Sequence, residues 1–389
     1  MVALLNALRK VTIRTAAVLG VIALAACETA SVGGGPSINT RAPVTVALLV
    51  PASGGDSGGT LAASIENAAR LAVGDLQGAE IDLRVYDTGG SPALAAQVAQ
   101  QAVNDGAKII LGPVFAEAAN AAGVAVASRG INVLSLSNNP AIAGGNVFVL
   151  GQTFGNTAER LVRYANAQGK GDIFIVHGRD TAETLGRDAI QGAILASGAR
   201  LAGTASFDLS QQGVINAIPG IASQVDLSNA TSVFLTSGTA GALPFLADLL
   251  PENGVNPAEV QYIGLQRFDI PSSALSLTGL QGGWFALPDP ATAAQFQARY
   301  AAAYGAPPHP LAALAYDGIA AIGALIATGQ SDALTASALT RPGGFVGANG
   351  IFRLTTTGTN ERGLAVAQVQ NNQVIVIDPA PRSFGGAGF

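Results

Sequence analysis

Short apolar runs alternate with helix-periodic segments along most of this 389-residue chain, and this alternation constrains the fold more than any other feature. The run Val44–Val50 ends at Pro51 and a glycine cluster, which predicts a buried strand. Leu61–Asp75 follows with apolar residues at helical spacing. Strands that are buried on both faces and separated by crossover helices form parallel, doubly wound sheets. The sequence therefore predicts an α/β fold with two such sheets in series.

The same pattern places the remaining elements. We expect strands at 44–50, 81–87, 108–112, 132–136, 172–177, 202–207, 232–236 and 260–265. We expect helices at 61–75, 93–104, 116–129, 157–168, 181–197, 214–224, 241–250, 296–304 and 311–328. Near the end, 350–354, 363–370 and 373–377 predict a small antiparallel meander that turns at Asn371-Asn372.

The N-terminal segment has the pattern of a secretory signal peptide, predicted here for residues 1–26. A basic start precedes a run of about twelve apolar residues, against the roughly twenty that span a bilayer. This run ends Leu24-Ala25-Ala26-Cys27, and Cys27 is the only cysteine. A small-small-Cys ending resembles the lipobox of bacterial lipoproteins, which implies lipidation of Cys27. The alternative is a plain exported protein with an unrelated cysteine.

Charge and composition restrict the partners. Removal of residues 1–26 takes three positive charges from a net charge of −5, which leaves −8. We expect no nucleic-acid partner, because phosphates require an excess of Lys and Arg. Membrane contact should come from acyl chains, with residues 27–42 as a flexible linker. Glu28 in place of an inner-membrane retention Asp favours the outer membrane over the inner, with the protein facing the periplasm.

Enzyme motifs find little support, and we predict a non-catalytic protein with no cofactor and no metal. Gly55–Gly59 spells the nucleophile motif of trypsin-like proteases, but both histidines follow Ser57, whereas that fold orders His, Asp and then Ser. We expect this motif to be a flexible loop. Two distant histidines cannot form a structural zinc site. Glycoside cleavage by a pair of carboxylates remains an open alternative, because the two groups need to be close only in the folded structure and not in sequence.

Several short motifs in matching order resemble type I periplasmic solute-binding proteins of the leucine/isoleucine/valine-binding kind. These motifs are Leu48–Gly54, Leu111–Pro113, Ser135–Pro140, Tyr316–Gly318 and Gly350–Arg353. The resemblance covers about residues 43 to 379. It implies two lobes joined by three crossovers, with a ligand cleft between them. Lobe 1 would be 43–152 plus 284–330, lobe 2 would be 153–283 plus 331–379, and we expect 380–389 to be disordered.

The resemblance also implies which residues would line the cleft. These cleft residues are Ser53, Phe115, Ser135, Ser137, Asn138, His177, Thr236 and Gln266. The family's acid for a ligand ammonium is replaced by Gln266, next to Arg267, and its cleft tyrosine by Leu185. We therefore expect a cleft whose amino-acid chemistry is eroded. For each residue a structural role stays open, because serine and asparagine at strand ends also cap helices.

Two functional hypotheses follow. Gly358–Val366 resembles the tail of penicillin-binding protein activators, outer-membrane lipoproteins that stimulate a bifunctional peptidoglycan synthase. This resemblance favours a lipid-anchored adaptor that regulates peptidoglycan synthesis. The alternative is a substrate-binding lipoprotein that hands a branched-chain amino acid, or a similar small polar solute, to an ABC permease. A sensory or orphan binder is a third possibility.

Overall fold

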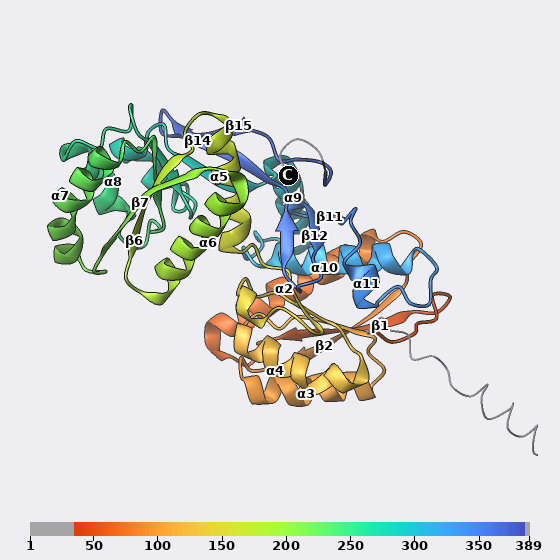
Figure 1. Ribbon diagram of the computed structural model, residues 1–389. Helices are drawn as coiled ribbons and strands as arrows, with labels where there is room; N and C mark the ends of the chain where they lie inside the picture. The colour runs from red at the N-terminus through yellow and green to blue at the C-terminus, as the bar shows by residue number, and fades with distance from the viewer. Residues whose placement is uncertain (1–34, 386–389) are drawn as a thin grey trace, which may run out of the picture. The chain divides into compact units, whose positions relative to one another are not determined.

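The computed structural model describes residues 35–385, so the signal segment and Cys27 lie outside the described residues. Within this range a parallel sheet and a second, mainly parallel sheet are each covered by helices on both faces, which confirms the predicted α/β fold (Figure 1). No helix in residues 35–385 combines the length and apolarity needed to cross a membrane.

The first sheet has five parallel strands in the order β2-β1-β3-β4-β5. Alternate residues of β1 point to opposite faces, as the period of a strand requires. Val46 and Leu48 pack with α2 and α10, whereas Ala47 and Leu49 pack with α3 and α4. Its elements are β1 (Val44–Val50), β2 (Ile81–Asp87), β3 (Ile109–Leu111), β4 (Val133–Ser135), β5 (Val147–Val149), α2 (Gly55–Asp75), α3 (Pro92–Asn104), α4 (Ala116–Val126), η1 (Ala127–Arg129), η2 (Pro140–Ile142), α9 (Pro290–Tyr304), α10 (Ala312–Ile326) and α11 (Ala336–Leu339).

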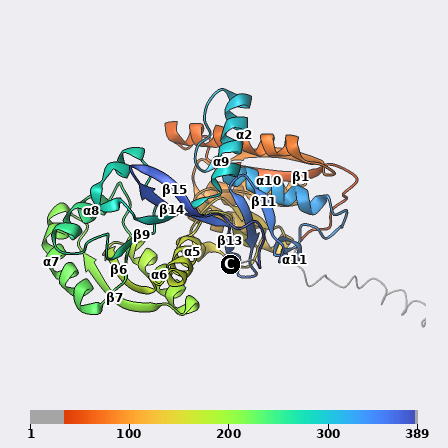
Figure 2. The same ribbon diagram turned by 90° about the horizontal axis from the view of Figure 1, so that it is seen from above.

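The second sheet has seven strands in the order β15-β14-β10-β9-β8-β6-β7. It is mixed, because β14 runs antiparallel to both β10 and β15 (Figure 2). Phe174 and Val233 face α7 and α8, and Ile175 and Phe234 face α5 and α6. Its elements are β6 (Asp172–Gly178), β7 (Arg200–Phe207), β8 (Ser232–Leu235), β9 (Gln261–Gly264), β10 (Trp284–Pro288), β14 (Leu364–Gln370), β15 (Gln373–Asp378), α5 (Phe154–Ala167), α6 (Thr181–Ser197), α7 (Gln211–Ser228), α8 (Leu243–Glu252), η3 (Ser272–Ser276) and η4 (Thr278–Leu280).

The C-terminal part is arranged differently from the expected meander. A small antiparallel sheet is present, but its strands are β11 (Phe345–Gly347), β12 (Gly350–Leu354) and β13 (Asn360–Arg362). The other two predicted strands extend the second sheet instead, because β14 finds a partner in β10, which the sequence analysis did not predict. The turn at Asn371-Asn372 is confirmed, with positive φ at both residues.

The prediction that the protease-like motif at Gly55–Gly59 forms a flexible loop is wrong. Residues Gly55–Gly59 form the first turns of α2, which begins six residues before the predicted start at Leu61. The predicted helix start rested on apolar spacing, and the first turn of a helix can lack apolar residues because it need not contact the core.

The contacts also move the expected lobe boundaries. Trp284–Pro288 pairs with β9 in the second sheet rather than joining the first lobe. Leu334, Leu339 and Phe352, expected in the second lobe, pack in the core of the first sheet. In the expected disordered tail, Ala380 is buried against the second sheet, so the described part of that tail is packed.

Candidate functional site

A cavity of about 880 Å³ lies where the carboxyl ends of first-sheet strands meet β9, β10 and α9. This is the edge at which parallel α/β sheets bind ligands, and the volume falls in the usual range for small-molecule sites. Its lining comes from the loops after β3 (Val114–Ala116), β4 (Leu136–Asn139), β5 (Gly151, Gln152) and β9 (Arg267, Ile270), from the end of β10 and α9 (Leu287, Pro288, Pro290, Ala293, Ala294, Phe296, Gln297), and from 308–311, Ala313, Leu314 and Asn349.

The walls of the cavity are apolar. Phe115, at the N-cap of α4, exposes 47% of its surface, and Ile270, in the loop after β9, exposes 56%. Buried Phe296 of α9 adds a second ring. Large apolar side chains left open in a concave site favour a ligand with an apolar body.

Polar groups converge on the same cavity from several loops. The Ser137 hydroxyl lies in the lining and accepts a hydrogen bond from Asn139 N at 3.1 Å. His309 Nδ1 accepts from Leu311 N at 3.2 Å, so the neutral ring carries its proton on Nε2 and can donate from there. Asn138 and Asn349 add amide groups.

Charge in the cavity is one-sided. Arg267 lines it, and none of the Asp or Glu side chains described in 35–55 and 57–385 does. The Nε and Nη2 atoms of Arg267 donate to the two carboxylate oxygens of Asp269 at 2.8 and 2.6 Å. In the described part of the chain, Nη1 has no hydrogen-bond partner. The guanidinium is therefore oriented by Asp269 and keeps a free donor.

The structure brings three of the residues predicted from sequence into this cavity: Phe115, Ser137 and Asn138. The other five do not line it. Ser53 lies in the loop after β1, where its N–H and hydroxyl bind Asp87 and hold the pKa of that carboxyl below its usual value. Ser135 is fully buried, and its hydroxyl donates to Pro113 O at 3.2 Å. It ties the end of β4 to the loop after β3.

A buried carboxylate binds the polar groups at the ends of two second-sheet strands, β6 and β8. Glu183, in the first turn of α6, accepts hydrogen bonds from Gly178 N, Thr236 Oγ1 at 2.9 Å and Ser237 Oγ at 2.6 Å. These donors stand at the carboxyl ends of β6 and β8. Their hydrogen-bonding capacity is thus used inside the protein. His177 is buried as well and bonds through Nδ1 to Gly178 O at 2.6 Å.

Gln266 has a local role too. Its Nε2 donates to Thr236 O at 3.1 Å, while the next residue, Arg267, lines the cavity. Sequence reasoning noted Arg267 only as a neighbour of Gln266. It missed Ile270, Phe296 and His309, since no strand-end pattern marks them.

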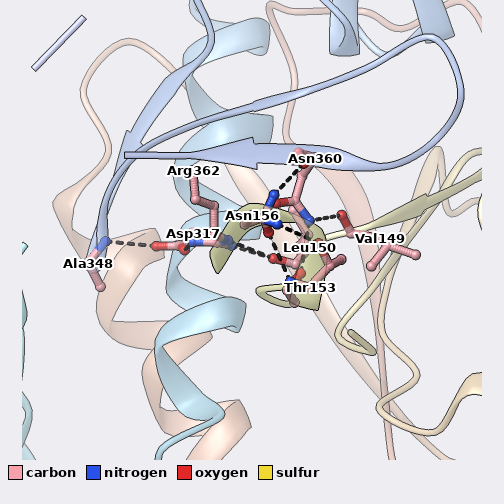
Figure 3. Close-up of polar contacts among 9 residues, drawn as sticks. Val149, Leu150, Thr153, Asn156, Asp317, Ala348, Asn360 and Arg362 are labelled. Atoms are coloured by element: carbon pink, nitrogen blue, oxygen red, sulfur yellow. Dashed lines mark hydrogen bonds and ion pairs between the residues drawn. The ribbon is translucent and has the colours of Figure 1, made fainter. Parts of the chain in front are cut away.

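The two sheets are joined by a buried polar junction beside this cavity (Figure 3). Asp317 of α10 is completely buried and accepts from Arg362 Nη1 at 2.9 Å and Ala348 N at 2.8 Å. Arg362 also donates to Leu150 O, after β5. Burial raises the pKa of Asp317, and Arg362 opposes that rise. Arg362 therefore ties the end of β13 both to α10 and to the crossover after β5.

Asn360 strengthens the same junction. Its Nδ2 donates to Val149 O at 2.8 Å and Gly151 O at 2.9 Å, and its backbone carbonyl accepts from Asn156 Nδ2 at 2.8 Å. Asn156 in turn forms a capping box with Thr153 at the start of α5. Residues 358–366, which resembled an activator tail, thus have a structural role in connecting the two sheets.

A family model described as periplasmic binding protein matches residues 43–373. The chain belongs to the periplasmic binding protein family. Membership implies a periplasmic location and agrees with the type I fold expected from the sequence motifs. No curated protein sequence matches the chain.

Solved structures of periplasmic binding proteins share the fold at low identity. A putative branched-chain amino acid ABC transporter protein from Rhodospirillum rubrum is 17% identical, with a TM-score of 0.74 over 86% of this chain and 100% of that one. A Desulfitobacterium hafniense substrate-binding protein in complex with Leu is 17% identical, with a TM-score of 0.61 over 86% and 100%. A Rhodopseudomonas palustris BisB5 solute-binding protein with 3,4-dihydroxy benzoic acid is 18% identical, with a TM-score of 0.57 over 89% and 99%. None of these comparisons supports the penicillin-binding protein activator hypothesis.

Proposed function

We propose that this periplasmic binding protein captures a small solute in its cavity and delivers it to an ABC permease. The observation that carries the proposal is the cavity itself, which has apolar walls and convergent polar groups at the carboxyl ends of parallel strands. Family membership and the substrate-binding relatives support the same function. The alternative of the sequence analysis is therefore favoured over the cell-wall adaptor.

Phe115, Ser137 and Asn138 are the predicted cleft residues that we assign to ligand contact. They come from the loops after two neighbouring strands, β3 and β4, so one ligand can touch all three. The protein would act by binding alone, without catalysis. We also retain lipidation of Cys27 as part of the proposal, which would keep the protein near the membrane that holds its permease.

Thermal unfolding of the full-length protein with a panel of amino acids, carboxylates, amides and sugars tests this function. A solute at 100 times its dissociation constant should stabilise the protein by about 2.7 kcal/mol. Phe115→Ala should weaken the binding of that solute about tenfold or more, because it removes one apolar wall. Leu195→Ala is the matched control, since Leu195 is an exposed apolar residue of α6 outside the cavity. Absence of any stabilising solute, together with failure to cross-link a permease in cells, would overturn the proposal.

A further inference from the structure

The cavity lacks the group that an amino-acid ligand requires. An α-amino acid carries an ammonium group, and burying this charge without a paired acid costs several kcal/mol. Among the side chains that the structure describes, those of residues 35–55 and 57–385, no carboxylate lines the cavity. The acid that stands nearest in sequence to Arg267 is Asp269, and both of its oxygens already accept hydrogen bonds from that arginine.

The cavity instead presents a cation from the second sheet. After β9, Gln266 donates a hydrogen bond to Thr236 O and does not line the cavity, whereas the next residue, Arg267, does. A guanidinium has a planar set of donors that matches the geometry of a carboxylate. Asp269 holds two of the nitrogen atoms and so fixes the plane of the group. The remaining donor atom, Nη1, has no partner among the described residues.

The rest of the lining restricts the body of the ligand. Phe115 from the first sheet and Ile270 from the second leave large apolar surfaces open in the same cavity, with Phe296 of α9 also in its lining. Two of these three are aromatic rings, which favour a planar or branched hydrocarbon. The amides and the hydroxyl of Ser137 can serve further oxygen atoms on the ligand.

We propose that the cavity binds a small carboxylate with an apolar or aromatic body and no ammonium group, and that Arg267 receives the anionic end. This inference rests on the proposed function, because it names the substrate class of the same site.

Isothermal titration calorimetry on the full-length protein tests the substrate class with matched probes. The acids are 4-methylpentanoate and 3-phenylpropanoate, their amino-acid counterparts are leucine and phenylalanine, and 4-methylpentanamide is the neutral control. We expect the acids to bind at least tenfold more tightly than the other probes. Equal or tighter binding of the amino acids or of the amide overturns the inference and leaves the proposed function standing. Failure of all probes and of the wider solute panel would overturn both.

Two substitutions test the role of Arg267 itself. Arg267→Met should weaken 3-phenylpropanoate binding by about 10- to 100-fold, the range for loss of a charged hydrogen bond. Asp269→Asn leaves the charge of Arg267 in place but removes one of the two oxygens that orient it, so it should weaken binding less than Arg267→Met does.

The Arg179–Asp208 pair offers a matched control. It is an exposed ion pair of the second sheet, 2.9 Å long, and neither residue lines the cavity. Arg179→Met and Asp208→Asn should leave 3-phenylpropanoate binding unchanged. Unchanged 3-phenylpropanoate binding in Arg267→Met would overturn the assignment of Arg267.

Discussion

Replacing Arg362 with Met should destabilise the protein strongly, because it leaves a buried charge without its partner. The Asp317 side chain has no exposed surface, and that of Arg362 exposes 4%. Without the guanidinium, Asp317 keeps only backbone donors such as Ala348 N. Breaking a buried ion pair from one side costs about 3–5 kcal/mol. Leu150 O also loses its donors from Arg362, so the upper part of this range is expected.

The stability lost in Arg362→Met should increase as the pH rises. Burial already raises the pKa of Asp317 above its usual value of 3.8, and removal of Arg362 raises it further. Between 3.8 and the raised pKa, the folded protein holds a proton that the unfolded chain has released. Stability must therefore fall as pH rises through this window. Arg362→Met should be least stable near neutral pH and recover part of the loss in mild acid.

Urea unfolding followed by the fluorescence of Trp284 measures these changes, since Trp284 is the only tryptophan and is buried in β10. Asp317→Asn with Arg362→Met should cost less than the sum of the two single changes, by about 1–3 kcal/mol. Arg70→Met, at an exposed ion pair on α2, should change stability by no more than about 0.5 kcal/mol. A loss under about 1 kcal/mol for Arg362→Met, or additive single changes, would refute the reasoning.

Three further predictions concern other buried or terminal groups. Glu183→Ala should cost about 3 kcal/mol or more in urea unfolding, because three donors lose a charged acceptor, whereas Glu259→Ala on the surface should have little effect. Burial raises the pKa of Tyr262 above its usual 10.0, so stability should fall as pH rises above about 10. Tyr262→Phe should flatten that fall and cost about 1 kcal/mol at neutral pH, because Val255 O loses its donor; an unchanged alkaline profile would contradict this. Cys27→Ser should move the protein from the membrane fraction to the soluble fraction of cells, and retention in the membrane would argue against lipidation.

The sequence predicted the parallel strands and crossover helices well, because a buried strand such as β1 and an amphipathic helix such as α2 carry strong periodic signals. It missed β5, β11 and β13, which have three residues each and show no period. It also missed β10, in which Pro288 and the preceding glycines read as a turn. That omission misplaced β14, whose partner in the sheet is β10.

The site was predictable only in part for a related reason. Phe115, Ser137 and Asn138 follow buried strands, and the carboxyl ends of parallel strands meet at one edge. Arg267 and Ile270 lie in an irregular loop, and Phe296 lies on a helix. Nothing in their spacing shows that they converge. Glu183 could not be recognised either, because a glutamate in the first turn of a helix ordinarily complements the helix dipole at the surface.

The first sheet depends on chain that is synthesised much later. Its core contains Leu48 and Ile65 but also Ile322 of α10 and Phe352 of β12, whereas strands β6 to β9 of the second sheet are contiguous in sequence. As the chain emerges from its N-terminus, the face of α2 that packs against α10 has no cover until about residue 326 is available. Contacts of such high sequence separation form slowly and leave surface open to aggregation. Folding of this protein should thus begin with strands β6 to β9 of the second sheet, and the core of the first sheet should form last.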